Sequence, residues 1–231
     1  MKAIGMIGGM SWESSLEYYR LINEFIKEQL GGLHSAKCLL YSVDFAEIEE
    51  LQMHERWREA ALVLSKAAMS LEKGGADFIV LCTNTMHKVA DEIQSSVSIP
   101  FLHITDAVAG EIKGRGLKKI GLLGTRFTME EDFYKTRLIE KHGLEVIVPE
   151  ESERREIHRV IYEELVLGKI LENSREVYHK IIGRLAARGA EGIILGCTEI
   201  GLLVKQGNSP IPLFDSTQIH ARAAVTLALE K

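Results

Sequence analysis

Short apolar segments alternate along this chain with longer amphipathic stretches. The short segments end in glycine or polar residues, a pattern typical of strands buried in a parallel sheet. In the longer stretch Trp57–Lys73, alanine and leucine recur with helical spacing, which predicts a helix that ends at Gly74 and Gly75. Strands that alternate with helices indicate βαβ units, so the predicted fold class is α/β, with mostly parallel sheets flanked by helices. Strands are predicted at Ala3–Ile7, Lys37–Ser42, Phe78–Leu81, Phe101–Ile104, Lys119–Leu123, Glu145–Val148, Gly192–Leu195 and Leu213–Phe214.

The chain also repeats itself at an offset of 112 to 116 residues. Each match is weak alone, because βαβ segments converge on similar patterns, but three matches in one order indicate a duplicated architecture. The matched pairs are Lys2–Gly9 with Lys118–Thr125, Gly75–Thr83 with Gly189–Thr198, and Ile99–Leu102 with Ile211–Phe214.

The repeat predicts two pseudo-symmetric α/β domains. We expect residues 1–105 together with 215–231 to form the first domain, and residues 106–214 to form the second. The apolar segment Ile219–Leu229 would return as a helix to the first domain. Ligand sites of parallel sheets lie at the carboxyl ends of their strands, so the active site is expected in the cleft between the domains.

Two cysteines occupy equivalent positions in the repeat. Cys82 follows the strand Phe78–Leu81, and Cys197 follows Gly192–Leu195 with one inserted glycine. Hydroxyl residues after each cysteine are expected to begin a helix, whose N-terminus would lower the pKa of the thiol. Two thiols on opposite sides of one carbon can remove a proton from one face and return it to the other, which inverts a stereocentre. The alternative is that both are buried packing residues at strand ends.

Hydrogen-bond donors surround both cysteines in the sequence. The α-proton of an amino acid is a poor acid, so a racemising site must stabilise an enolate-like carboxylate with preorganised donors. Helix N-capping is the alternative role of these residues, and both roles can coexist. The candidate donors are Thr83, Asn84, Thr85, Thr125 and Thr198.

Composition narrows the classes of function. The chain has 231 residues, 46% apolar and 26% charged, which excludes a disordered or fibrous chain. A net charge of −5 without a basic block argues against a nucleic-acid partner. No apolar run is long enough to span a membrane, and the one at the N-terminus is too short for a signal peptide. The odd number of cysteines, three, argues for a reducing compartment, so we expect a cytoplasmic protein.

No metal or cofactor motif accompanies these residues. The segment His54–Arg58 lacks the second histidine of a zinc-binding helix, and no C-x-x-C occurs. The glycines of Gly5–Gly9 and Gly121–Gly124 do not fit the dinucleotide-binding pattern. We therefore expect neither a metal nor a cofactor.

Three further features have structural interpretations. Cys38 lies in an alternating strand pattern and is interpreted as a packing residue. His87 follows Cys82 closely, and a structural hydrogen bond is its expected role. The charged segment Glu150–Glu156 is interpreted as a solvated loop and helix start, with a mobile cover over the cleft as the alternative.

Four motifs together resemble the aspartate/glutamate racemase family over essentially the whole chain: Gly8-Gly9-Met10-Ser11-Trp12-Glu13-Ser14, Cys82-Thr83-Asn84-Thr85-Met86-His87, Gly124-Thr125-Arg126-Phe127-Thr128-Met129 and Gly196-Cys197-Thr198-Glu199. The resemblance implies a cofactor-independent enzyme that interconverts L- and D-amino acids, usually as a homodimer. It implies that Cys82 and Cys197 are the acid/base pair and that Glu199 assists Cys197. By the same resemblance, the positions that bind the substrate carboxylate in this family correspond to Asn84, Thr85, Thr125 and Thr198. Met10 is a further candidate for contact with the substrate.

The sequence departs from the aspartate-specific members of that family. These members carry an arginine and a lysine that hold the side-chain carboxylate, and Ile48 and Val166 align there. The motif Ser11–Ser14 and the acidic segment around Ile48 resemble a branch of broader-range racemases. Gln52 is then a candidate ligand for a neutral side chain, with a solvated helix position as its alternative. The expected substrates are aspartate and glutamate or a broader range of small polar and neutral amino acids.

Three other functions are alternatives on the same residues. A related decarboxylase resembles this family but keeps one of the two cysteines. A dicarboxylate isomerase would need cationic residues that the motifs around Cys82 and Cys197 lack. A non-catalytic two-domain solute-binding protein would need no paired thiols.

Overall fold

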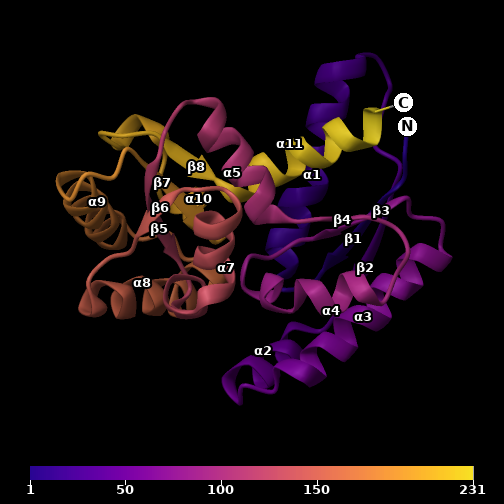
Figure 1. Cartoon of the computed structure of the whole chain (residues 1–231), viewed down its shortest axis with the longest axis horizontal. Helices are drawn as coiled ribbons and strands as arrows, with labels where there is room; N and C mark the ends of the chain where they lie inside the picture. The colour runs from indigo at the N-terminus through magenta and orange to yellow at the C-terminus, as the bar shows by residue number, and fades with distance from the viewer. Residues whose placement is uncertain (231) are drawn as a thin grey trace. The chain divides into compact units, whose positions relative to one another are not determined.

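The computed structural model describes residues 1–230 and contains two separate parallel β-sheets of four strands each. The strand orders are β2-β1-β3-β4 and β6-β5-β7-β8, and every neighbouring pair is parallel. Each sheet therefore has the same order, and helices lie on both faces of each (Figure 1). The predicted α/β class with two pseudo-symmetric sheets is confirmed.

The chain divides into two compact units, which we call unit 1 (Met1–His103 and the residues from His220 onward) and unit 2 (Ile104–Ile219). Unit 1 contains β1 (Ile4–Gly8), α1 (Trp12–Leu30), β2 (Cys38–Ser42), α2 (Phe45–Met53), α3 (Trp57–Lys73), β3 (Phe78–Leu81), the 3₁₀ helix η1 (Thr85–Val89), α4 (Ala90–Ser95) and β4 (Phe101–Leu102). The last helix, α11 (Ser216–Leu229), begins in unit 2 and ends in unit 1.

Unit 2 repeats the alternation of strands and helices. It contains α5 (Ile104–Gly114), β5 (Lys119–Gly124), α6 (Arg126–Glu130), α7 (Asp132–Thr136), the π-helix η2 (Arg137–Lys141), β6 (Glu145–Ile147), α8 (Glu151–Glu163), η3 (Leu165–Leu167), α9 (Glu172–Ala187), β7 (Gly192–Gly196), α10 (Ile200–Leu203), η4 (Gln206–Asn208) and β8 (Leu213–Asp215).

The two faces of each sheet hold separate apolar clusters. In unit 1, β1 alternates its side chains, so that Ile4 and Met6 pack with α1 and α11 while Ile7 packs with α3. In unit 2, α5 and η2 cover one face, and α8, α9 and α10 cover the other. Because both faces are buried, the central strands β1, β3 and β7 are apolar at every position that is not glycine, and β5 departs from this only at its first residue, Lys119.

All eight predicted strands are present, with differences at their ends. The helix predicted at Trp57–Lys73 has those bounds. The strand predicted at Phe101–Ile104 is too long, because β4 pairs with β3 through only two residues. Ile104 instead begins α5, and its side chain is buried in an apolar cluster of unit 2. None of the helices described in residues 1–230 combines the length and apolar character needed to cross a membrane.

His220 attaches α11 to the rest of unit 1. Its imidazole is fully buried, Nε2–H donates to the Leu102 carbonyl at 2.9 Å, and Nδ1 accepts from the Tyr18 hydroxyl at 2.8 Å. This arrangement needs the neutral ring, since one nitrogen donates and the other accepts. Burial lowers the pKa of His220 to about 4.

We expect the stability of the protein to depend on pH through His220. Its folded-state pKa lies below its unfolded-state value, so protonation favours the unfolded chain. The stabilisation is complete above the unfolded pKa of 6.5 and is lost as the pH falls toward 4. Over this range the free energy of unfolding should fall by about 3 kcal/mol, at roughly 1.36 kcal/mol per pKa unit. Urea unfolding of His220→Gln should show a weaker loss of stability over this pH range than wild type.

The exposed His34 provides the matched control, and His34→Gln should keep the wild-type pH dependence. An unchanged pH dependence in His220→Gln would contradict this interpretation.

Candidate active site

Cys82 lies directly after β3, at the carboxyl end of the unit 1 sheet. Its backbone N–H donates to the Ile7 carbonyl at 2.9 Å, and its carbonyl accepts from the Ser14 hydroxyl at 3.0 Å. The thiol is fully buried. Both backbone groups of the cysteine are therefore held, one by β1 and one by α1.

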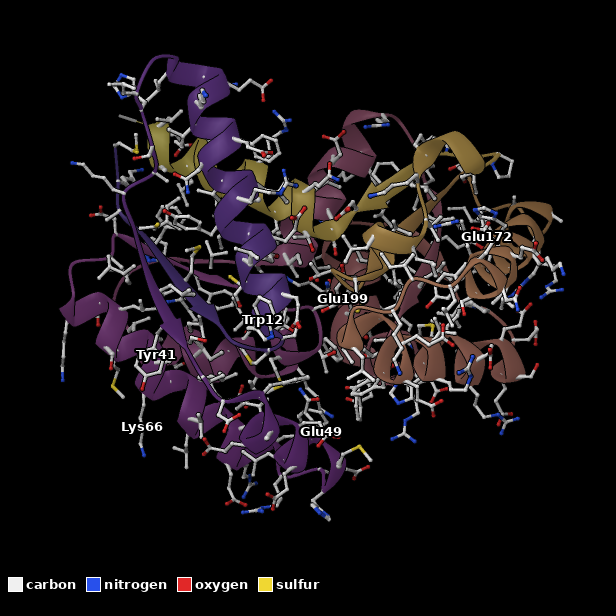
Figure 2. The ribbon with its side chains drawn as sticks, turned by 180° about the vertical axis from the view of Figure 1, so that it is seen from behind. Trp12, Tyr41, Glu49, Lys66, Glu172 and Glu199 are labelled. Atoms are coloured by element: carbon white, nitrogen blue, oxygen red, sulfur yellow. The ribbon has the colours of Figure 1, made fainter. Side chains whose placement is uncertain are left out.

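Cys197 has the corresponding place in unit 2, directly after β7. Its thiol donates to the Glu199 carboxylate, with 3.0 Å between Sγ and Oε2. Glu199, labelled in Figure 2, is itself buried and stands immediately before α10. A buried carboxylate next to a thiol can accept its proton.

The pKa of both thiols is raised, whereas the sequence predicted that helix N-termini would lower it. Burial is the cause at Cys82. At Cys197 burial is the largest cause, followed by the negative charge of Glu199 and the hydrogen bond to it. The sequence-based expectation is wrong because the helices that follow are short: η1 has 5 residues and α10 has 4. One turn of helix contributes less than the loss of water around a buried thiol.

The residues that follow Cys82 form a turn that His87 holds in place. His87 Nδ1–H donates to the Thr83 carbonyl at 2.7 Å, and the His87 backbone N–H donates to the Asn84 carbonyl at 3.1 Å. Asn84 and Thr85 are buried in the same turn. The structural hydrogen bond expected for His87 is confirmed.

Gln52 and Met10 lie in the buried part of unit 1. Gln52, on α2, is 3% exposed, and its Nε2 lies 2.9 Å from the sulfur of Met86 in η1. It therefore does not occupy the solvated helix position considered as its alternative. Met10 is buried in the cluster that also contains Ile48 of α2.

Thr125 and Thr198 are the corresponding hydroxyl residues of unit 2. Thr125 caps α6, since its Oγ1 accepts from the Thr128 backbone N–H at 3.3 Å. Thr198 Oγ1 accepts from the Thr217 hydroxyl at 3.1 Å. The capping role considered for Thr125 is thus present, and it leaves a ligand role open.

Each sheet brings its own candidate site residues together at the carboxyl ends of its central strands. Ile7 pairs with Leu81 in unit 1, so the residues after β1 and the Cys82 turn leave the sheet side by side. Gly124 pairs with Gly196 in unit 2, which places Thr125 beside Cys197. Unit 1 thus carries Met10, Gln52, Cys82, Thr83, Asn84 and Thr85, and unit 2 carries Thr125, Cys197, Thr198 and Glu199.

Two supporting residues were missed by the sequence analysis. Ser14 lies in one of the motifs, but nothing in the sequence shows that its hydroxyl reaches the Cys82 carbonyl. Thr217 lies at the start of α11, far along the chain from its partner Thr198. Among the described residues, no group of three or more His, Cys, Asp or Glu side chains is placed to hold a metal ion.

A model of the Asp/Glu/Hydantoin racemase family matches residues 7–224. The chain belongs to this family. The family resemblance found in the sequence motifs is therefore confirmed, and membership makes the protein an isomerase.

Three relatives illustrate the similarity. A Yersinia pestis protein provisionally described as an Asp/Glu racemase is 58% identical, with a TM-score of 0.94 and full coverage of both chains. An aspartate racemase homologue from Pyrococcus horikoshii OT3 is 42% identical, with a TM-score of 0.88 and full coverage of both chains. The broad specificity amino-acid racemase RacX of Bacillus subtilis is 25% identical over 230 residues, which is 98% of each chain.

We expect Glu199→Gln to make the Cys197 thiol more acidic, because the substitution removes the negative charge that raises its pKa. The pH profile of iodoacetamide alkylation at Cys197, followed by peptide mass spectrometry, should move to lower pH. Glu163→Gln removes an exposed carboxylate elsewhere in unit 2 and should leave the profile in place. An unmoved profile in Glu199→Gln would show that the carboxylate does not act on this thiol.

Proposed function

We propose that this protein is a cofactor-independent amino-acid racemase in which Cys82 and Cys197 transfer the α-proton. The observation that carries the proposal is the duplicated strand–cysteine–threonine turn, which places one thiol at the carboxyl end of a central strand in each sheet. Membership of the racemase family and similarity to a named broad specificity racemase support it.

The proposed reaction begins with both cysteines protonated, because their pKa values are raised. Cys197 passes its proton to Glu199, and the resulting thiolate removes the α-proton from one face of the amino acid. Cys82 then donates its proton to the opposite face of the α-carbon. One turnover leaves Cys197 as the thiol, Cys82 as the thiolate and the first proton on Glu199, and this state reacts with the opposite enantiomer. Release of the Glu199 proton to solvent and uptake of one proton by Cys82 restore the starting state. Two thiols with exchanged roles thus serve both directions.

Stabilisation of the carbanion falls to the donors beside each cysteine. Loss of the α-proton moves negative charge onto the substrate carboxylate, so hydroxyl and amide donors aimed at it lower the barrier. We assign this role to Thr83, Asn84 and Thr85 in unit 1, and to Thr125 and Thr198 in unit 2.

Neutral side chains are the proposed substrate preference. Where aspartate-specific members are expected to carry cations, this chain has the fully buried Ile48 and, in η3, Val166. Gln52 is buried beside η1 and offers an uncharged amide. A second carboxylate on the substrate would have no cation at these positions, and desolvating it there is costly.

The proposed mechanism also requires a reducing compartment in the cell. Cys38, Cys82 and Cys197 are all free thiols, and acid/base chemistry requires two of them to stay reduced. We therefore propose the cytoplasm as a reducing location.

Substitution of either cysteine tests the proton transfer. Cys82→Ala and Cys197→Ala should each lower the rate of inversion by about 10³-fold or more, because each removes one of the two acid/base groups. The measurement is chiral chromatography of a reactive amino acid in deuterated water, where wild type should also place deuterium at the α-carbon. Cys38→Ala is the matched control and should keep full activity.

Elimination of HCl from 3-chloroalanine separates a two-base scheme from a general loss of activity. One thiolate suffices to remove the α-proton while chloride leaves from the β-carbon, and the aminoacrylate product hydrolyses to pyruvate and ammonia. Each single variant should therefore eliminate from one enantiomer only, and the two variants should prefer opposite enantiomers. Wild-type inversion in either variant would refute the scheme.

Binding of amino acids without α-proton exchange in wild type would favour a solute-binding protein instead.

The substrate preference has its own measurement. In a panel of L-amino acids incubated in deuterated water, we expect neutral hydroxyl and amide side chains to exchange their α-protons faster than aspartate and glutamate, because the substituted positions hold no cation. Val166→Lys, which places a cation at the aligned position that is only partly buried, should raise the relative rate with aspartate. Exchange restricted to aspartate and glutamate in wild type would overturn the preference and leave the two-thiol mechanism intact.

A further inference from the structure

The chain passes between the two units at two points, and a buried histidine stands at each of these chain crossings. Unit 1 ends at His103 before α5 begins, and it resumes at His220 within α11. His103 is 8% exposed, and His220 is fully buried. An imidazole in an apolar interior costs free energy unless its surroundings compensate, so its presence at both crossings calls for a specific contact.

Both of these histidines contact the ring of His87. The ring centroids of His87 and His103 lie 4.6 Å apart, and those of His87 and His220 lie 5.8 Å apart. Phe101 packs on the same group, with its ring centroid 5.5 Å from that of His87 and 6.1 Å from that of His103. All four pairs meet edge to face, an arrangement that aromatic rings prefer. We call His87, His103 and His220 the histidine cluster.

His220 is held firmly within this cluster. Its Nε2–H donates to the Leu102 carbonyl in β4, and its Nδ1 accepts from the Tyr18 hydroxyl of α1. The ring cannot rotate without the loss of a hydrogen bond in the protein interior, which is costly. His87 therefore packs against a ring that α1, β4 and α11 together keep in place.

His87 connects the histidine cluster to the turn after Cys82. Its Nδ1–H donates to the Thr83 carbonyl at 2.7 Å. The peptide between Thr83 and Asn84 is trans, so its carbonyl and its N–H point in opposite directions. Because the carbonyl is held toward His87, the Asn84 N–H is directed away from the histidine cluster. The hydrogen bond thus selects one orientation of this peptide.

The backbone of Cys82 itself is held independently of His87. Its carbonyl accepts from the Ser14 hydroxyl at 3.0 Å, and its N–H donates to the Ile7 carbonyl at 2.9 Å. Loss of the His87 imidazole would leave these two bonds in place and release the peptide that follows. We therefore expect the consequence to fall on the donors of Asn84 rather than on the thiol.

We propose that His87 is a positioning residue for the α-proton transfer, held in place by the histidines at the two chain crossings. It orients the peptide between Thr83 and Asn84 so that the donors of Asn84 face the substrate carboxylate, where negative charge accumulates as the α-proton leaves. This role rests on the proposed racemase function, because it is defined by the donors that the reaction uses.

The turn after Cys197 has no counterpart of His87. The repeat places Leu202 at the corresponding position, and its side chain is 42% exposed. Thr198 is held instead by the Thr217 hydroxyl at the start of α11. Each turn is thus in contact with α11 within its own unit, but a histidine positions only the turn after Cys82.

Three substitutions of His87 test where its hydrogen-bond donor must lie. His87→Asn keeps a donor near the place of Nδ1, His87→Gln moves the donor toward the place of Nε2, and His87→Leu removes it. Chiral chromatography should show kcat for inversion reduced about 10²-fold in His87→Leu and His87→Gln, the size of the loss of one donor to a developing negative charge. His87→Asn should stay near wild type. KM should change little in all three, because the donors act mainly in the transition state.

Elimination from the two enantiomers of 3-chloroalanine separates the Asn84 donors from the thiol. The donors serve the carbanion whichever thiolate forms it, so His87→Leu should slow both eliminations by a similar factor. Cys197→Ala identifies the enantiomer on which Cys82 acts. A loss confined to that enantiomer would assign His87 to the thiol and overturn the proposal.

His103→Leu tests the contribution of the chain crossing. It removes a ring from the histidine cluster and keeps the bond from His87 to Thr83, so kcat should fall by a smaller factor than in His87→Leu. Full activity in His103→Leu would overturn the role of the crossing. His179, half-buried on α9 of unit 2, is the matched control, and His179→Leu should keep wild-type activity.

Circular dichroism checks that each variant folds, and the comparison of His87→Asn with His87→Gln decides the matter if His87→Leu unfolds. Full activity in His87→Gln, or equal losses in His87→Asn and His87→Gln, would overturn the positioning role. The proposed function would still stand if Cys82→Ala and Cys197→Ala had lost inversion. A wild type that does not exchange α-protons would overturn the racemase function, and this role with it.

Discussion

Parallel pairing of the two central strands in each sheet is the constraint on which the candidate site depends. It fixes where β1 and β3 end relative to each other, and likewise β5 and β7. At Gly124 and Gly196 the backbones approach closely, because a methyl group on Gly124 would lie 2.9 Å from the Gly196 carbonyl. A side chain at either position would push the strand ends apart. Glycine is therefore needed there if Thr125 and Cys197 are to leave the sheet side by side.

The duplicated turns are alike in backbone but differ in electrostatics. Cys197 has Glu199 within hydrogen-bonding distance, whereas the repeat places Asn84 at the corresponding position after Cys82. An amide cannot accept a thiol proton as a base, so the two cysteines start from unequal conditions. Because two enantiomers have equal free energy, the ratio kcat/KM of a racemase is the same in both directions. That requirement does not oblige its two bases to have equal surroundings.

Sequence patterns predicted those features that depend on local periodicity. The strands were predicted from short apolar segments between amphipathic stretches, and the helix Trp57–Lys73 from its helical spacing and the glycines that follow it. The structure contains them. The repeat predicted that the two cysteines follow equivalent strands. The signal for the strands and the helix lies in neighbouring residues, and the repeat is found by comparing two segments of the sequence, so neither requires knowledge of the fold.

Features that depend on burial were not predictable in the same way. The pKa of Cys82 is raised because side chains from distant segments exclude water, and a strand–turn motif carries no record of them. Gln52 has the polarity of a surface residue, yet packing of α2 places it beside Met86. Ile104 extends an apolar run, but the ladder ends at Leu102 because β4 pairs for only two residues. Tertiary packing decides all three.

The covering of the sheet edges shows how a duplicated fold diverges. Gln94 and Gln206 are separated by the same 112 residues as the strands they cover, so this device belongs to the repeat itself. The opposite edges have no such correspondence: β6 is short and charged, whereas β2 is longer, uncharged and open. The repeat has therefore kept its covering glutamine in both halves and diverged at the opposite edges, where strand length and charge differ.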